Sequence, residues 1–187
     1  MNRILIDTGY NGGRSCSGEQ IAPSEHPAYR IGNYLDEILT RMGFDTLLSD
    51  RVPELGERGS GEGRPSVCAA LARRWKADCL LRLCVRPSRL PCSGEAEAFA
   101  NRRDANSLRL SRHLIEEVAR GSMLRQGAVH ASNGILLLRK TSCPASMLVL
   151  RIPFSQQERM TEQEAHGYAA SIASGLGTFY GMQKKHV

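Results

Sequence analysis

Residues 3–13 have the sequence RILIDTGYNGG, in which three consecutive apolar residues are followed by a glycine-rich segment. A short apolar run that ends at turn-forming residues predicts a buried strand over Arg3–Asp7 with a loop behind it. Further on, Ser24 is expected to cap a helix that has Pro27 in its first turn and ends at Gly43. A buried strand, a loop and a helix in this order are typical of the start of an α/β domain.

The rest of the chain continues this alternation of apolar runs and helix-like segments. Strands are expected at Asp45–Ser49, Cys79–Val85, Ile135–Leu138 and Met147–Ile152, and helices at Val67–Trp75, Ala105–Arg120 and from Thr161 to about Tyr180. The last helix is predicted to open with a capping box, because Glu164 follows Thr161 by three residues. The pattern predicts a single three-layer α/β domain over residues 1–187, with a mostly parallel, twisted sheet of about six strands and helices on both faces.

The composition excludes several classes of protein. The chain is 41% hydrophobic and 24% charged, which is not the composition of a disordered tail, a collagen-like repeat or a coiled coil. Its net charge is +6, and 21 of the 25 basic residues are Arg. With 5% aromatic residues and no pattern for stacking bases, no nucleic-acid partner is predicted. No apolar run is long enough to span a bilayer and no secretory leader is seen, so a cytoplasmic monomer is the expectation from the residues alone.

Six cysteines are present, at positions 16, 68, 79, 84, 92 and 143. None forms a CxxC pair, and their spacing does not match a zinc ribbon or knuckle. We interpret most of them as small buried apolar residues. In parallel α/β sheets, functional sites form beyond the carboxyl ends of the strands. That rule points to Thr8–Tyr10, Ser24–His26, Cys84–Arg86 and Arg151–Phe154.

Segments at these places resemble the zinc-dependent N-acetylmuramoyl-L-alanine amidases, which hydrolyse peptidoglycan. Residues 4–13, ILIDTGYNGG, look like the first strand and loop of that family, whose motif there is Asp-x-Gly-His-Gly-Gly. The resemblance continues through residues 24–26 (SEH), 42–49 (MGFDTLLS), 76–84 (KADCLLRLC), 136–139 (LLLR) and 143–145 (CPA), ahead of a strand that leads to Phe154. It implies one amidase-like catalytic domain without a separate wall-binding domain, a zinc cofactor, peptidoglycan or a muropeptide as partner, and a location outside the cell or in the cell wall.

The family holds zinc with His, Glu and His, and a second Glu assists the attacking water. The resemblance places Glu25 at the Glu ligand, Tyr10 and Cys84 at the two His positions, and Arg151 at the catalytic Glu. A phenol with a pKa near 10 is a poor zinc ligand, and a guanidinium cannot accept a proton. No His precedes His26, and no Asp or Glu occurs between positions 118 and 157, so no small shift in alignment restores the set. The sequence therefore predicts lost or strongly altered activity.

Several interpretations of these residues stay open. Glu25 is either a metal ligand or an anion at the start of a helix, and Cys84 is either a thiolate ligand, with Glu25 and a remote His, or a buried small residue. Arg151 either pairs with Glu25 in place of the metal charge or extends to solvent at a strand end. Together with Arg82 it could form an anion-binding cleft. Arg86 and His130 are further candidates for substrate binding.

Two classes of function follow. One is an N-acetylmuramoyl-L-alanine amidase with a rebuilt metal site, as the resemblance implies. The other is a non-catalytic pseudo-amidase that binds wall fragments or a protein partner. The replaced residues favour the second class, because three parts of the family's mechanism are missing by residue type.

Overall fold

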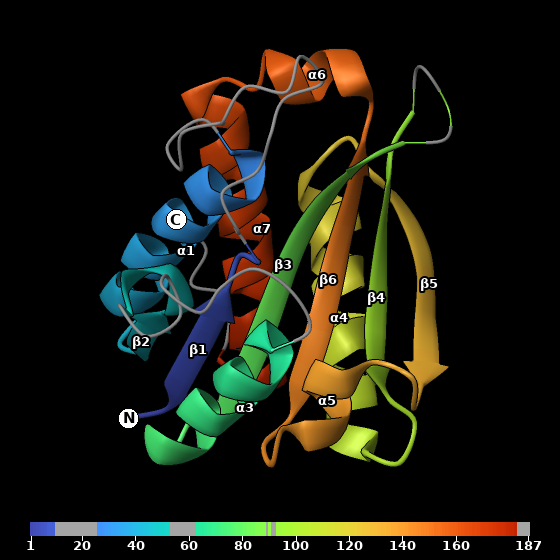
Figure 1. Cartoon of the computed structure of the whole chain (residues 1–187). Helices are drawn as coiled ribbons and strands as arrows, with labels where there is room; N and C mark the ends of the chain where they lie inside the picture. Colours follow the sequence, from blue (N-terminus) through green and yellow to red (C-terminus); the bar gives the residue numbers. More distant parts are fainter. Residues whose placement is uncertain (10–25, 53–62, 89, 91–92, 183–187) are drawn as a thin grey trace.

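The computed structural model describes residues 1–9, 26–52, 63–88, 90 and 93–182 (Figure 1). The strands are β1 (Arg3–Asp7), β2 (Asp45–Leu48), β3 (Cys79–Pro87), β4 (Glu95–Asn101), β5 (Arg125–Ser132) and β6 (Ala145–Ile152). The helices are α1 (Pro27–Arg41), the 3-10 turn η2 (Ser49–Arg51), α3 (Arg64–Arg74), α4 (Ala105–Gly121), α5 (Leu136–Lys140), α6 (Phe154–Glu158) and α7 (Glu162–Phe179).

The six strands form one sheet in the order β2-β1-β3-β6-β4-β5. β1 pairs in parallel with β2 and β3, β3 with β6, and β4 with β5. The pair between β4 and β6 is antiparallel, so the sheet is mixed. The mostly parallel α/β sheet expected from the sequence is confirmed, and the first buried strand, β1, lies inside it between β2 and β3.

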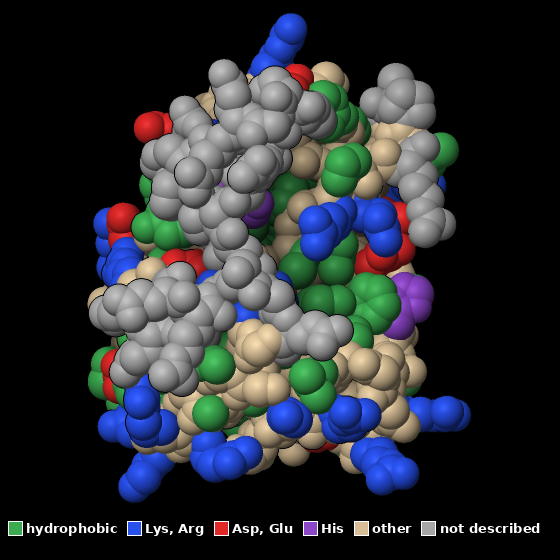
Figure 2. All heavy atoms as spheres, in the orientation of Figure 1, with side chains coloured by type: hydrophobic (Ala, Val, Ile, Leu, Met, Phe, Trp, Pro, Cys, Tyr) green, Lys and Arg blue, Asp and Glu red, His purple; other side chains and the backbone are tan. Residues whose placement is uncertain are grey.

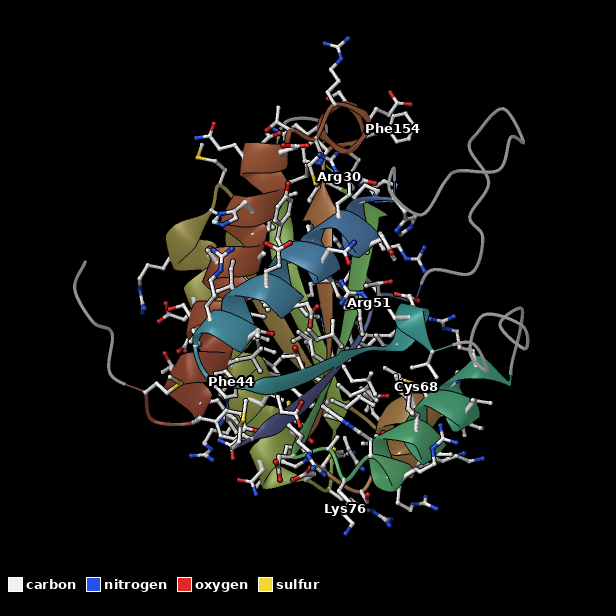
Figure 3. The ribbon with its side chains drawn as sticks, turned by 90° about the vertical axis from the view of Figure 1, so that its left-hand side faces the viewer. Arg30, Phe44, Arg51, Cys68, Lys76 and Phe154 are labelled. Carbon is white, nitrogen blue, oxygen red and sulfur yellow. The ribbon has the colours of Figure 1, made fainter. Side chains whose placement is uncertain are left out.

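Helices cover both faces of the sheet, as predicted (Figures 1 and 3). On one face, α1, α4 and α7 bury a large apolar core that includes Ile4, Leu81 and Leu148. On the other face, α3 and α5 bury a smaller core around Leu80 and Leu137. The alternation of side chains along a strand explains the division, because neighbouring residues such as Leu80 and Leu81 enter opposite cores.

Local sequence determines where the long helices begin and how closely they pack. Pro27 occupies the first turn of α1, but the residue that precedes the helix is His26 and not the predicted Ser24, which lies outside the described residues. The predicted capping box of α7 is confirmed: Thr161 Oγ1 accepts the Glu164 N–H at 3.2 Å, and the Glu164 side chain accepts the Thr161 N–H at 2.7 Å. A Cβ at Gly175 would lie 3.0 Å from the backbone of α4, so this glycine permits close packing of α7 on α4.

Two parts of the expected secondary structure are wrong. The apolar run predicted as a strand over Ile135–Leu138 is instead the start of α5. A four-residue apolar run carries no period that separates a strand from a buried helix, and here Leu137 and Leu138 are buried beside α3. The predicted set also lacks β4 and β5, while β6 begins two residues earlier than expected.

Two of the four described cysteines are buried core residues, as the sequence predicted. Cys68 and Cys79 are buried, whereas Cys84 and Cys143 are half-buried, and all four are free thiols. Cys16 and Cys92 lie outside the described residues. Among the helices that the structure describes, none is long and apolar enough to cross a membrane.

Candidate functional site

The candidate site lies on the sheet face that carries α3 and α5, towards the carboxyl ends of β1, β3 and β6. These strands are parallel, so their carboxyl ends meet at one edge of the sheet, as the sequence predicted. α3 and α5 cover the sheet around Leu80, while further along β3 the side chains on this face are Arg82, Cys84 and Arg86. Figure 2 shows basic and acidic side chains side by side on this face.

The carboxylate of Asp7, at the end of β1, is fully buried between two arginines. Asp7 Oδ2 accepts a hydrogen bond from Arg82 Nη1 at 2.5 Å, and Oδ1 accepts from Arg64 Nη2 at 3.1 Å and from the Ser49 hydroxyl at 2.9 Å. Burial alone would raise the pKa of Asp7, but the charges of Arg82 and Arg64 outweigh it and lower the pKa below 3.8. Asp7 is therefore ionised at neutral pH and joins β1, β3 and α3.

A second carboxylate, Asp50, extends this network at the end of β2. Arg64 Nη2 donates to Asp50 Oδ1 at 2.6 Å, and the Thr8 hydroxyl donates to Asp50 Oδ2. Arg64 is 3% exposed, so its charge is held inside the protein by these carboxylates. Burial, with a contribution from Asp7, raises the pKa of Asp50 despite the opposing contacts from Thr8 and Arg64.

Arg151, at the carboxyl end of β6, is bound by carboxylates of the neighbouring strand. Its Nε donates to Glu97 Oε2 at 2.9 Å and lies 3.9 Å from Glu95 Oε1. The antiparallel register of β4 and β6 places Glu95 directly opposite Arg151 and Glu97 opposite Val149, so all three charged groups project from the same face. Arg151 is 20% exposed and paired, so the alternative that it extends freely to solvent is wrong.

Arg86 is the register partner of Arg151 on β3, and its side chain is exposed. Within the described part of the chain, no carboxylate lies in ion-pair distance of its guanidinium. Cys84, two residues earlier, is half-buried next to the Arg82 guanidinium. His26 is near both Asp50 and Arg86. Burial lowers the pKa of His26, the negative charge of Asp50 raises it, and the positive charge of Arg86 lowers it further. Among the described residues at this edge of the site, the guanidinium of Arg86 is exposed and has no carboxylate partner.

The structure separates residues that the sequence analysis grouped together. Tyr10 and Glu25 lie outside the described residues, so the pairing of Glu25 with Arg151 stays a prediction. Arg82 lies opposite Met147 in the sheet and binds Asp7, whereas Arg151 binds Glu97. The two guanidiniums expected to line one anion-binding cleft are therefore each neutralised by a different carboxylate.

His130, a candidate for substrate binding from the sequence, lies in β5. Its ring stacks on Phe99 of β4, with centroids 4.7 Å apart and planes at 25°. β5 is the edge strand of the sheet, two strands away from β6. This stacking partner gives His130 a packing role at the sheet edge.

Four charged residues of the site escaped the sequence analysis: Arg64, Asp50, Glu95 and Glu97. Arg64 is the first residue of α3, and its side chain reaches Asp7 across 57 positions of sequence. Glu95 and Glu97 belong to β4, in which the half-buried residues Glu95, Glu97 and Phe99 alternate with three buried alanines. That strict alternation over Glu95–Ala100 is the signal that could have identified β4 and the acidic partners of Arg151.

Solved structures resemble this chain, although two comparisons of its sequence found no match. No protein-family model matches the sequence, and no curated protein matches it. Among solved structures, the catalytic domain of CwlV, an N-acetylmuramoyl-L-alanine amidase from Bacillus (Paenibacillus) polymyxa var. colistinus, matches with a TM-score of 0.74 and 17% identity over 98% of this chain and 100% of that one. The chain has the fold of an amidase catalytic domain.

Two clostridial structures give the same result. The CwlD amidase from Clostridioides difficile, solved in complex with the GerS lipoprotein, matches with a TM-score of 0.76 and 13% identity over 98% of this chain and 100% of that chain. An N-acetylmuramoyl-L-alanine amidase from Clostridium difficile 630 matches with a TM-score of 0.76 and 16% identity over 99% of this chain and 98% of that one. The predicted resemblance is thus confirmed at the level of the fold, across nearly the whole chain.

The described residues do not fit the zinc site that this fold carries in the amidase family. Zinc in a hydrolase needs three converging protein donors, usually His, Glu, Asp or Cys. In the part of the chain that the structure describes, no three such side chains are grouped to hold a metal ion. Cys84 lies beside the guanidinium of Arg82, and the guanidinium of Arg151 is bound to Glu97. No catalytic step through zinc is derived from these residues.

Proposed function

We propose that this chain is an amidase-fold protein that binds peptidoglycan fragments and does not hydrolyse the muramoyl–L-alanine amide by the zinc route. The observation that carries the proposal is the state of Arg151. The sequence resemblance aligns it with the catalytic Glu of the family, and its Nε lies 2.9 Å from Glu97 Oε2. A guanidinium in an ion pair cannot take a proton from water, so the general base that amide hydrolysis requires is missing at this position.

The charges around the site support binding rather than hydrolysis. Arg151 is neutralised by Glu97 and Glu95, and Arg82 is held by Asp7, which leaves Arg86 as the exposed guanidinium on this face of β3. Arg forms bidentate hydrogen bonds with carboxylates. The stem peptides of peptidoglycan carry carboxylates, so Arg86 is the residue that we assign to their recognition.

The surface beside Arg86 suits a ligand with both charged and apolar groups. Val149 is buried in the sheet opposite Cys84, between the pairs that Arg82 and Arg151 form with their carboxylates. A muropeptide combines carboxylates with alanine methyl groups. Its carboxylate would bind Arg86, and a methyl group would contact the half-buried side chain of Cys84, two residues earlier on β3.

Calorimetric titration of the full chain with N-acetylmuramoyl-L-alanyl-D-isoglutamine tests the proposal. Its carboxyl-amidated analogue is the matched ligand, and Arg86→Gln is compared with Arg112→Gln, which removes an exposed arginine from α4 on the opposite side of the sheet. We expect Arg86→Gln and the amidated analogue each to weaken binding about tenfold, the size of one charge-assisted hydrogen bond, and Arg112→Gln to leave binding unchanged.

The same titration can overturn the proposal. Absence of binding by the wild-type chain, or equal loss in Arg86→Gln and Arg112→Gln, would remove the assigned role of Arg86. Chromatography of the titrated samples should recover the ligand intact. Circular dichroism of each variant checks that the fold is retained.

A further inference from the structure

We propose that the end of the molecule opposite the candidate site docks on an anionic lipid bilayer. Seven exposed cations gather at this end, which we call the basic end. They are Arg73, Arg74, Lys76, Arg102, Arg103, Arg139 and Lys140. Figure 2 shows Lys and Arg side chains along the lower edge of the molecule, and Figure 3 labels Lys76 at the same edge.

The topology of the sheet explains why cations from three separate segments meet here. α3 ends at Arg74 and α5 ends at Lys140, and the two helices contact each other on the same face of the sheet. β4 runs antiparallel to β6, so the turn after β4, which contains Arg102 and Arg103, reaches the edge where β6 begins. Basic residues at the carboxyl ends of helices are also favoured by the helix dipole.

The carboxylates nearest to the basic end are engaged in other contacts. Asp45 forms an ion pair with Arg3 at 3.2 Å, and Asp78 accepts the backbone N–H of Arg3 at 2.8 Å. Asp104 caps α4, where it accepts the Asn106 N–H at 3.0 Å. Asp45 is thus neutralised by Arg3, whereas Asp78 and Asp104 keep their negative charges. Against these two carboxylates, the seven cations give the described part of the basic end a net positive charge.

The character of the basic end favours a bilayer over a nucleic acid as its partner. Trp75, an aromatic residue at this end, is half-buried and lies against the Arg3 guanidinium at 5.8 Å, so it is poorly placed to stack on a base. Met1 is 87% exposed at the same end, where β1 begins. Clusters of Lys and Arg side chains are attracted to anionic membranes, because the attraction adds up over the basic residues close to the surface.

Docking through this end would fix the orientation of the site. β1, β3 and β6 run away from the basic end, so their carboxyl ends, with Arg86 and Arg151, lie at the far side of the molecule (Figure 1). A chain held on a bilayer would therefore present its candidate site away from the lipid. This inference does not depend on the ligand of the candidate site.

Vesicle co-sedimentation of the full chain tests the inference. The vesicles contain phosphatidylcholine alone or with about 30% phosphatidylglycerol. The triple variant Arg73→Gln, Arg102→Gln, Arg139→Gln removes charge from the basic end, and the matched control Arg112→Gln, Arg125→Gln, Arg159→Gln removes the same charge from exposed positions elsewhere. We expect binding to the anionic vesicles only, a loss of about tenfold or more in the basic-end variant, and little change in the control.

Three outcomes would overturn the inference. The first is no binding to anionic vesicles, and the second is an equal loss in both triple variants, which would show a net-charge effect without a docking surface. The third is tighter binding to a labelled DNA duplex than to the vesicles, lost in the basic-end variant, which would assign the surface to nucleic acid. Raising the salt concentration to about 0.5 M should release the chain from the vesicles, since screening weakens such contacts. Thermal unfolding of each variant checks that it is folded.

Discussion

Arg151 of β6 and Glu97 of β4 form an ion pair across the antiparallel strands, with Nε and Oε2 2.9 Å apart. Both side chains are largely shielded from solvent, at 20% and 16% exposure. We expect Glu97→Gln to lower the free energy of unfolding by about 1–2 kcal/mol, because a half-buried guanidinium loses its charged partner. Urea denaturation measures this loss.

Glu95→Gln is the matched control for that variant. Glu95 lies farther from Arg151, at 3.9 Å, and is 33% exposed. Its replacement should cost less than about 0.5 kcal/mol, as for other exposed ion pairs. If the two variants lose the same stability, the pair with Glu97 is not the contact that holds Arg151.

The sequence identified only one partner of this ion pair. The resemblance identified Arg151 as a replaced base, but its partner could not be named while β4 was missing from the predicted strands. Alanine has a low strand propensity, which conceals a strand built from alternating Glu and Ala. The antiparallel pairing of β4 with β6 could not be predicted from the sequence either, because local patterns do not determine which strands become neighbours.

The buried network at the end of β1 should be the most sensitive part of the site. Asp7 is fully buried and contacts both Arg82 and Arg64, so Asp7→Asn leaves two buried or half-buried guanidiniums without their shared charge. We expect a loss of about 3–5 kcal/mol in the free energy of unfolding. Asp45→Asn, which breaks an exposed pair with Arg3, should cost less than about 1 kcal/mol. Similar losses in the two variants would contradict the network's role.

The ionisation of Asp7 predicts a pH dependence of stability. Its pKa is lower in the folded protein than the ordinary value of 3.8, so folding favours the ionised carboxylate. The stability that Asp7 contributes is therefore complete above pH 3.8 and is lost as the pH falls below 3.8 towards the folded pKa. Urea denaturation of the wild-type chain and Asp7→Asn across this range should show their difference shrinking with acidity. A difference that stays constant down to pH 2.5 would contradict the lowered pKa.

Gly9 lets the chain pass closely over Arg82. Its φ is +64°, and a Cβ there would lie 2.4 Å from Arg82 Nη2, so Gly9→Ala combines backbone strain with a displaced guanidinium. Gly43→Ala isolates the strain, because Gly43 has φ +89° and nothing within 4 Å of the added carbon. We expect Gly43→Ala to cost about 1 kcal/mol and Gly9→Ala at least about 1 kcal/mol more in thermal or urea unfolding. Equal costs would mean that Arg82 moves aside freely.

We expect the amidase fold of this chain to bind muramoyl peptides without cleaving them. The most direct measurement is the release of the free amino terminus of L-alanine from muramoyl peptides by the full chain, followed by mass spectrometry with and without added zinc, together with the metal content of the purified protein. We predict no stoichiometric zinc and no cleavage, with the muramoyl peptide bound intact. Stoichiometric zinc with cleavage of the muramoyl–L-alanine amide would contradict the claim.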